Sequence, residues 1–306
     1  MWSYTLRRLL ATIPTLLAVI TVSYILVHAA PGGPFDSERT VSPEVLANLQ
    51  AKYGLDKPMW QQYLQYLNNL LHGDLGASFR YADWSVNELV ANALPVSLSI
   101  GATSLVLATL IGVGLGIAAA LKQNSAADYG VMLVSNMGSV FPSFVVGPVL
   151  VLVFALWLKW LPAGGWDDFA PRFMILPIAL LTFINVATIA RVMRGSLIEV
   201  LHSNFIRTAR AKGLPTRIVV LRHALKPALL PVVSLLGPLA ISSITAALVT
   251  ETIFSLPGIG KLIVNGAGNR DYTLVLGLVV LITVLAVTLN LLVDLAYAAL
   301  DPKIRY

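Results

Sequence analysis

The sequence predicts an all-α polytopic membrane protein with six transmembrane helices. Of its 306 residues, 57% are hydrophobic and only 12% are charged, and the mean hydropathy is +0.78. These values exceed what the core of a soluble protein of this length requires. Six windows contain no Asp, Glu, Lys or Arg and are long enough to cross a bilayer as helices, whereas barrel strands would be short and alternating. The windows are Leu9–Ala30, Leu94–Leu121, Tyr129–Leu158, Phe173–Ala190, Pro227–Thr250 and Tyr272–Val293.

The distribution of cations indicates how these helices are oriented. If the N-terminus is cytoplasmic and the six spans alternate, the inner loops and ends hold 13 of the 21 Lys and Arg but only four of the 15 Asp and Glu. Cytoplasmic loops of membrane proteins carry such an excess of cations. We therefore expect both termini in the cytoplasm. Anionic lipid accounts for most of the basic character, so no nucleic-acid partner is expected.

The N-terminal third divides into a first helix and an external segment. Arg7 and Arg8 resemble the start of a signal peptide, but the apolar run of 22 residues that follows is longer than a secretory core. We therefore expect an uncleaved helix in residues 1–30 and an external helical insertion in residues 31–93. In this insertion Ser42–Gly54 and Met59–Leu71 each have helical signals. The two helices either lie along the membrane interface or cover the outer mouth of a pathway.

The sequence lacks motifs for catalysis or cofactor binding. A P-loop around Gly260-Lys261 fails at two positions, which are occupied by Ser255 and Leu262. The four histidines are scattered, no Gly-x-Ser-x-Gly sequence is present, and the chain has no cysteine. We therefore expect a protein that is not an enzyme and has no metal, no other cofactor and no nucleotide site of its own.

Carboxylates are also missing from the middle of the predicted spans. Glu251 and Asp294 stand at the ends of the last two spans, where we expect them to be solvated. A proton-coupled carrier would need carboxylates near the midplane, so the sequence disfavours that class.

Small and polar residues predict close packing between the spans. Gly112 and Gly116 share one face of the second span and allow two helix backbones to approach closely. The third window should kink or break at Phe141-Pro142-Ser143, because proline removes an amide and its ring clashes with the preceding turn. Polar groups at depth must face protein or water, so they form structural hydrogen bonds or line a pathway. They are Thr182, Asn185 and Thr188 in the fourth span, and Ser242, Ser243 and Thr245 in the fifth.

Between the fourth and fifth windows, residues 203–227 are too charged to span a membrane. Asn204 can cap a short helix, Gly213 can end it in a left-handed turn, and Pro215-Thr216 can start a second helix. A loop that only maintained topology would not require a capped helix. We therefore expect this segment to dock on a partner.

The segment resembles the cytoplasmic EAA loop of inner-membrane permease subunits in binding-protein-dependent ABC importers. That loop carries a Glu-Ala-Ala sequence, a later glycine and an Ile-x-Leu-Pro ending. Here Thr208-Ala209 stand for the alanines, Gly213 for the glycine, and His223-Ala224-Leu225 with Pro227 for the ending. Arg207 replaces the glutamate, His223 replaces the isoleucine and the proline comes one residue late, as in the peptide-permease branch.

Three further stretches are similar to dipeptide and oligopeptide permeases, most of all to their B-type subunits. The stretches are Arg7–Gly32, Glu251–Tyr272 and Val293–Tyr306. The resemblance therefore covers the whole chain. It implies the type I ABC importer permease fold, a multi-pass position in the bacterial inner membrane, and the function of a permease subunit in an ATP-driven oligopeptide importer.

The same resemblance implies an organisation, partners and site residues. Residues 94–297 would form the permease core and residues 298–306 a cytoplasmic tail. The partners would be a second permease subunit of the C type, two ATPase subunits that hydrolyse the ATP, an external peptide-binding protein and membrane lipid. The short helix would dock in an ATPase cleft, with Ala209 and Ala211 allowing close approach and the cations making charge-assisted contacts. The expected docking residues are Arg207, Thr208, Ala209, Arg210, Ala211, Lys212 and Gly213.

Between the fifth and sixth spans, Pro257, Gly258 and Gly260 predict a tight re-entrant turn. It is either an external gate of the pathway or a passive connector. Asn185, Ser242, Ser243 and Thr245 remain candidates for the pathway lining.

Other functions stay open from the sequence. They are a permease for dipeptides, glutathione or nickel, an ATP-independent carrier or channel, and a membrane scaffold. Neighbouring genes for ATPases and a secreted binding protein would favour the importer.

Overall fold

The structure is a computed structural model that describes residues 2–29, 54–81 and 83–300. Throughout these ranges the regular elements are helices, and the only β-type pairing is an isolated bridge between Ala77 and Ser85. The expected external helix after Ser42 lies outside the described residues. The all-α prediction is confirmed.

Within the described chain, five helices are long and apolar enough to cross a membrane, and a bent helix pair makes a sixth if its two halves count as one span. The five are α1 (Trp2–Ala29), α4 (Val86–Leu121), α7 (Pro171–Leu201), α10 (Leu225–Ile253) and α12 (Tyr272–Leu300). The bent pair consists of α5 (Ala126–Val140) and α6 (Ser143–Leu150) with the π-helix η1 (Val151–Trp157). Each predicted window therefore has its helix.

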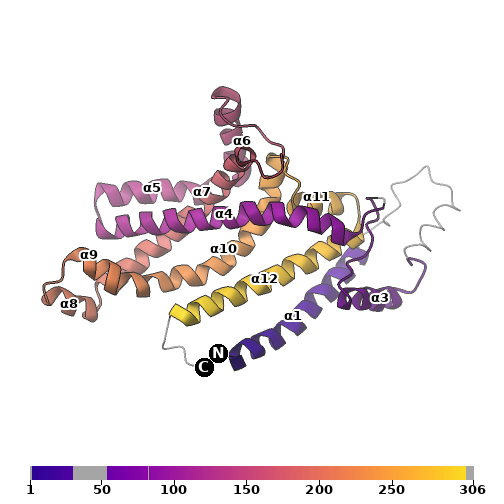
Figure 1. Ribbon diagram of the computed structural model, residues 1–306, viewed down its shortest axis with the longest axis horizontal. Coiled ribbons are helices and arrows are strands. Elements are labelled where there is room, and N and C mark those ends of the chain that lie inside the picture. The colour runs from indigo at the N-terminus through magenta and orange to yellow at the C-terminus, as the bar shows by residue number, and fades with distance from the viewer. Residues whose placement is uncertain (1, 30–53, 82, 301–306) are drawn as a thin grey trace.

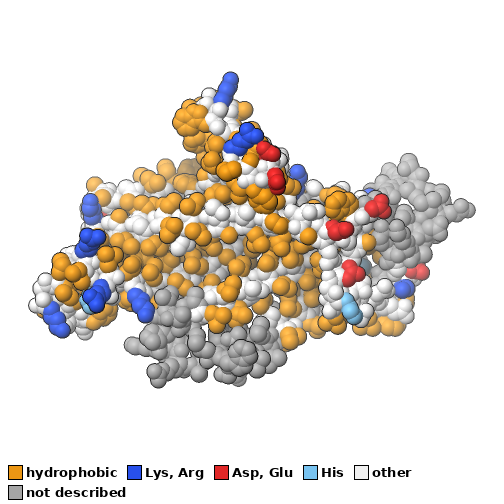
Figure 2. Space-filling view, in the orientation of Figure 1, with side chains coloured by type: hydrophobic (Ala, Val, Ile, Leu, Met, Phe, Trp, Pro, Cys, Tyr) orange, Lys and Arg blue, Asp and Glu red, His pale blue; other side chains and the backbone are white. Residues whose placement is uncertain are grey.

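The short helices lie at the two ends of this bundle (Figure 1). One end, called the α8 end, holds α8 (Asn204–Ala211), α9 (Thr216–Ile218) and the π-helix η2 (Val219–Ala224). The other, called the α3 end, holds α3 (Met59–Leu71) and α11 (Ile259–Gly268). On the face in Figure 2, Lys and Arg gather at the α8 end, while Asp and Glu lie towards the other end.

The third span is broken where the sequence predicts it. Phe141 has an extended backbone, with φ −83° and ψ 124°, and ends α5. Pro142 then precedes α6, and the two halves of the span meet at an angle of 105°. The arm formed by α6 and η1 consequently projects from the side of the bundle (Figure 1).

Helix α4 packs along α7 through two glycines. A Cβ atom on Gly112 would lie 2.8 Å from Ile189, and one on Gly116 would lie 2.6 Å from Met193. Real Cβ atoms do not approach so closely, so only glycine lets the two backbones come together. Gly114, on another face, has no neighbour within 4 Å of such an atom. The predicted packing face is therefore confirmed.

Helix α4 begins at Val86, inside the segment that we expected to be external. Ser85 accepts a hydrogen bond from the Glu88 backbone N–H (3.2 Å), and the Glu88 carboxylate accepts one from the Ser85 N–H (2.8 Å). This capping box satisfies amides that the first turn leaves without helical partners. The apolar window alone did not reveal this earlier start.

Candidate functional site

Helix α8 follows α7 after two residues. Ser203 is its N-cap residue, with φ −70° and ψ 156°, and Asn204 is already helical. Our prediction that Asn204 is the cap is therefore wrong. The Ser203 hydroxyl donates to the Val200 carbonyl of α7 (2.6 Å) and so closes the preceding helix.

The two faces of α8 have opposite surroundings. Ile206 and Ala209 are 0% and 7% exposed and belong to one buried cluster with Leu197 of α7 and Val219 of η2. The small side chain of Ala209 thus allows α8 to pack closely on its own protein. Phe205 on the other face is 51% exposed. Exposed with it are Arg207, Thr208, Arg210, Ala211 and Lys212.

The turn after α8 has the predicted left-handed conformation. Gly213 has φ +76°, and its N–H donates to the Arg210 carbonyl (2.9 Å). Pro215 is the N-cap of α9, which continues without interruption through η2 into α10 as one helical run, Thr216–Ile253. The second helix of the basic segment is therefore the start of the fifth span. It exposes Ile218 and Leu221, which the sequence analysis did not single out.

A buried ion pair joins α5 to α7. The Asp128 carboxylate, 1% exposed, accepts two hydrogen bonds of 2.6 Å from Nε and Nη2 of Arg194. Asp128 also accepts from the Asn124 N–H (2.9 Å) at the start of α5. We had counted Arg194 only as a cation of the inner side, because a pair 66 residues apart leaves no local signal.

The polar side chains in the middle of the bundle make specific contacts. Nδ2 of Asn185 donates to the Ser243 hydroxyl (3.0 Å) and joins α7 to α10. The Thr182 hydroxyl donates to the Ser104 carbonyl of α4 (3.3 Å). These residues therefore stabilise helix contacts. Ser242 is exposed on α10 and donates to its own helix, and the side chain of Thr245 lies outside the described residues.

At the α3 end, Glu251 of α10 is buried, with 1% exposure. Its Oε1 accepts a hydrogen bond from the Ser97 hydroxyl of α4 (2.5 Å), and its Oε2 accepts one from the Lys261 N–H (3.1 Å). Ser97 in turn accepts from the Ile259 N–H (2.9 Å). Our expectation of a solvated Glu251 is therefore wrong, because α11 folds back over the end of α10 and uses the carboxylate and Ser97 to cap its own first amides.

This arrangement explains the two glycines of the predicted turn. A Cβ atom on Gly258 would collide with the Glu251 carboxylate, and one on Gly260 with the backbone of Leu248. Both glycines are buried, while Pro257 is exposed. Glycine is thus required because α11 starts in direct contact with α10.

Asp271 makes a second buried anchor beyond the other end of α11. Its Oδ2 accepts from the Ser78 hydroxyl (2.5 Å), and its Oδ1 accepts from the N–H groups of Phe79 (3.2 Å) and Leu274 (3.1 Å). Asp271 therefore caps α12 and ties it to the segment that leads into α4. Nothing in the sequence pattern connects residues 193 positions apart.

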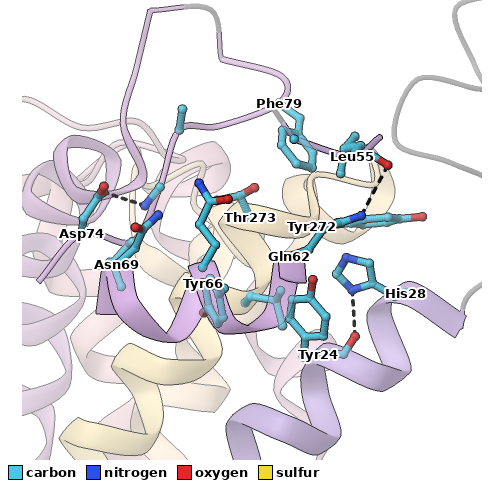
Figure 3. Close-up of a pocket in the computed structure, with 16 residues that line it drawn as sticks. Tyr24, His28, Leu55, Gln62, Tyr66, Asn69, Asp74, Phe79, Tyr272 and Thr273 are labelled. Carbon is cyan, nitrogen blue, oxygen red and sulfur yellow. Dashed lines mark hydrogen bonds between the residues drawn. The ribbon is translucent and has the colours of Figure 1, made fainter. Parts of the chain in front are cut away.

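A small aromatic pocket of about 260 Å³ lies at the same end, between α1, α3 and α12 (Figure 3). Tyr24 of α1 stacks on His28 and lies edge-on to Tyr63 of α3, whose hydroxyl is 2.6 Å from that of Thr21. Burial raises the pKa of the Tyr66 hydroxyl above its ordinary value, and the neighbouring Tyr24 adds to this. Helix α3 thus packs on α1 through its tyrosines, whereas its apolar residues Trp60, Leu64 and Leu71 are exposed.

A larger cavity of about 580 Å³ lies beside the start of α11. It is lined by Pro257, Gly258 and Lys261 and by aromatic residues that include Trp84 and Trp166. Within the described ranges, no three His, Asp or Glu side chains are grouped so that they could hold a metal ion.

Comparisons with known proteins agree over the full chain. Residues 112–306 match the family model of the "binding-protein-dependent transport system inner membrane component", and residues 1–101 match the model of its N-terminal part. The chain is 56% identical, over 306 residues and all of both chains, to the oligopeptide transport system permease protein OppB of Escherichia coli (strain K12). It is 39% identical to the dipeptide transport system permease protein DppB of Bacillus subtilis (strain 168), over 99% of this chain and 97% of that one.

Among solved structures, an inward-facing structure of the MetNI methionine ABC transporter is similar, with a TM-score of 0.61. The match covers 70% of this chain and 96% of that chain at 17% sequence identity. At this identity the similarity supports only the fold, which is that of type I ABC importer permeases.

Proposed function

The chain belongs to the inner-membrane components of binding-protein-dependent transport systems, and we propose that it is the permease subunit of an ATP-driven oligopeptide importer. Members of this family are multi-pass proteins of the bacterial inner membrane. The substrate class is inferred from the 56% identity, over the whole length of both chains, to an oligopeptide permease protein. The lower identity of 39% to a dipeptide permease protein makes dipeptides the second candidate.

The exposed face of α8 is the proposed docking surface for an ATPase subunit. Phe205 supplies an exposed apolar contact, and Arg207 and Arg210 can make charge-assisted hydrogen bonds with acidic groups of the partner. Ile206 and Ala209 pack α8 against α7. A displacement of α8 by the bound ATPase would therefore displace α7 as well. Two ATPase subunits, a second permease subunit of the C type and an external peptide-binding protein complete the proposed importer.

In this proposal the α8 end faces the cytoplasm and both termini are cytoplasmic. The gathering of Lys and Arg at that end supports this orientation (Figure 2). The α3 end, with its acidic side chains and aromatic pocket, then faces outwards.

The two permease subunits would enclose the pathway between them, so this chain supplies half of it. The side chains of Asn185 and Ser243 bond to each other, and both residues, with Ser242 and Thr245, are the proposed candidates for the lining. The turn at Pro257, Gly258 and Gly260, with α11, is the proposed outer gate, because it folds over the end of α10 and borders the larger cavity.

Growth on peptides tests the proposed function. Cells that need one amino acid and lack this gene should not grow when that amino acid is supplied only within a tri- or tetrapeptide. They should grow on the free amino acid, and a plasmid copy of the gene should restore growth on the peptide. Unimpaired growth of the deletion strain on peptides, with no other peptide importer in the strain, would refute the proposal.

A further inference from the structure

We propose that Ser97 and Glu251 form a joint that makes α4 and α11 move as one rigid element, so that motion of α8 reaches the outer gate. The proposal rests on the proposed function and adds to it the route by which the cytoplasmic end controls the outer end. Ser97 and Glu251 are positioning residues in this account, because they act through α11 and do not touch the transported peptide.

The route begins where α8 meets α7. Only two residues separate the helices, and the side chains of Ile206 and Ala209 lie in the same buried cluster as Met193 and Leu197 of α7. A displacement of α8 that left α7 in place would expose these apolar side chains to water. The two helices are therefore expected to move together.

The next step is from α7 to α4. Gly112 and Gly116 bring the α4 backbone against Ile189, Ala190 and Met193 of α7. Tightly packed interfaces change between discrete arrangements and do not deform continuously. Sliding α7 along α4 would drive the α4 backbone into the side chains of Ile189 and Met193, so α4 follows α7.

The last step is from α4 to α11. Ser97 lies beyond Pro95, in the part of α4 that also carries Gly112 and Gly116. It donates to Glu251 at 2.5 Å and accepts from Ile259 of α11 at 2.9 Å. The Ser97 hydroxyl thus donates to a residue of α10 and accepts from a residue of α11, so it links α4 to two other helices.

Separating α4 from α11 would leave buried polar groups without partners. Glu251 and Ser97 are 1% and 2% exposed, and a buried group that loses its hydrogen bond keeps the cost of its desolvation. The second anchor, from Asp271 to Ser78, ties the far end of α11 to the segment before α4. Both ends of α11 are therefore attached to α4 or its approach, and the helix cannot swing alone.

The joint is tested in the complete importer reconstituted in lipid vesicles, by counting peptides taken up for each ATP hydrolysed. In Ser97→Ala the Ile259 amide and Oε1 of Glu251 lose their shared partner, and in Glu251→Gln one amide oxygen must replace two acceptor oxygens. We expect this ratio to fall at least about tenfold in both variants, while the ATPase activity remains. Ser97→Thr keeps the hydroxyl and should restore coupling. Ser99→Ala is the matched control, because among the described residues the Ser99 hydroxyl bonds only to the Val96 carbonyl of its own helix.

A distance measurement tests the joint without relying on these variants. The natural chain has no cysteine, so spin labels can be placed at Val106 of α4 and Val264 of α11, which are both exposed. The distance between them should be the same in the resting complex and in the complex trapped with ATP and vanadate.

Two results would overturn the joint: a different distance in the two nucleotide states of the wild type, or wild-type coupling ratios in both Ser97→Ala and Glu251→Gln. A wild-type complex that takes up no peptide would refute the proposed function instead. The distance measurement would still test the joint in that case.

Discussion

Substitutions at two neighbouring residues of α8, one buried and one exposed, should have different effects. The substitution of the buried residue should weaken the attachment of α8 to the permease, and that of the exposed residue only its contact with the ATPase. Ile206 is 0% exposed in the cluster shared with α7, so Ile206→Ala removes a buried side chain and leaves a cavity. Such changes cost about 2–5 kcal/mol. A helix of 8 residues is not stable alone, so this loss should let α8 unfold locally.

Hydrogen–deuterium exchange of the amides in residues 204–212, with the permease in lipid nanodiscs, measures this attachment. In Ile206→Ala the exchange of these amides should accelerate at least about 30-fold, as a loss of about 2 kcal/mol implies. Phe205→Ala should leave the exchange unchanged, because that side chain is 51% exposed. Both variants should lose co-purification with the ATPase subunits. Unchanged exchange in Ile206→Ala, or full ATPase association in Phe205→Ala, would refute the two-face assignment.

Three further predictions follow from single positions. Gly116→Val should prevent correct assembly of the permease, because its Cβ would lie 2.6 Å from Met193. The measurement is the monodisperse fraction after detergent extraction, and Gly114→Val, which has no atom within 4 Å of its Cβ, should extract like the wild type. Gly213→Ala should keep ATPase association, because no atom lies within 4 Å and the strain at φ +76° costs about 1 kcal/mol. Gly213→Pro should lose that association, because proline cannot adopt this φ and lacks the N–H that bonds Arg210. A cysteine at position 73 should react with a membrane-impermeant thiol reagent in intact cells, whereas one at position 212 should react only after lysis; the reverse pattern would overturn the proposed orientation.

The sequence was sufficient for features that depend on local composition. Apolar windows located the five long helices and the bent helix pair, Pro142 located the break in that pair, and Gly213 located the turn after α8. Gly112 and Gly116 identified the packing face of α4 because their spacing matches one turn of a helix. In each case the physical cause lies within a few residues of the signal.

Features that depend on distant contacts could not be read in this way. Glu251 looked like a solvated helix end because the sequence does not show that α11 folds over it and that Ser97, 154 residues away, contacts it. The same holds for Asp128 with Arg194 and for Asp271 with Ser78. The start of α4 is different, because its signal, the Ser85–Glu88 capping box, is local and can be read in the sequence.

The division of α8 into two faces also required the structure. Ala209 fits a docking motif by its place in the sequence, but its burial depends on how α8 rests on α7 and η2. The exposed Phe205 is not part of that motif, and its exposure beside the buried Ile206 is visible only in the structure.

The proposed activity of this chain is to pass oligopeptides across the membrane at the expense of ATP. It is tested most directly by the uptake of a labelled, hydrolysis-resistant tetrapeptide into vesicles that contain the permease, its partner permease, the ATPase subunits and the peptide-binding protein. We expect the peptide to accumulate above the outside concentration when ATP is present on the ATPase side, and not to accumulate with a non-hydrolysable ATP analogue or without the binding protein. Accumulation driven by a proton gradient in the absence of ATP, or no accumulation under any of these conditions, would contradict it.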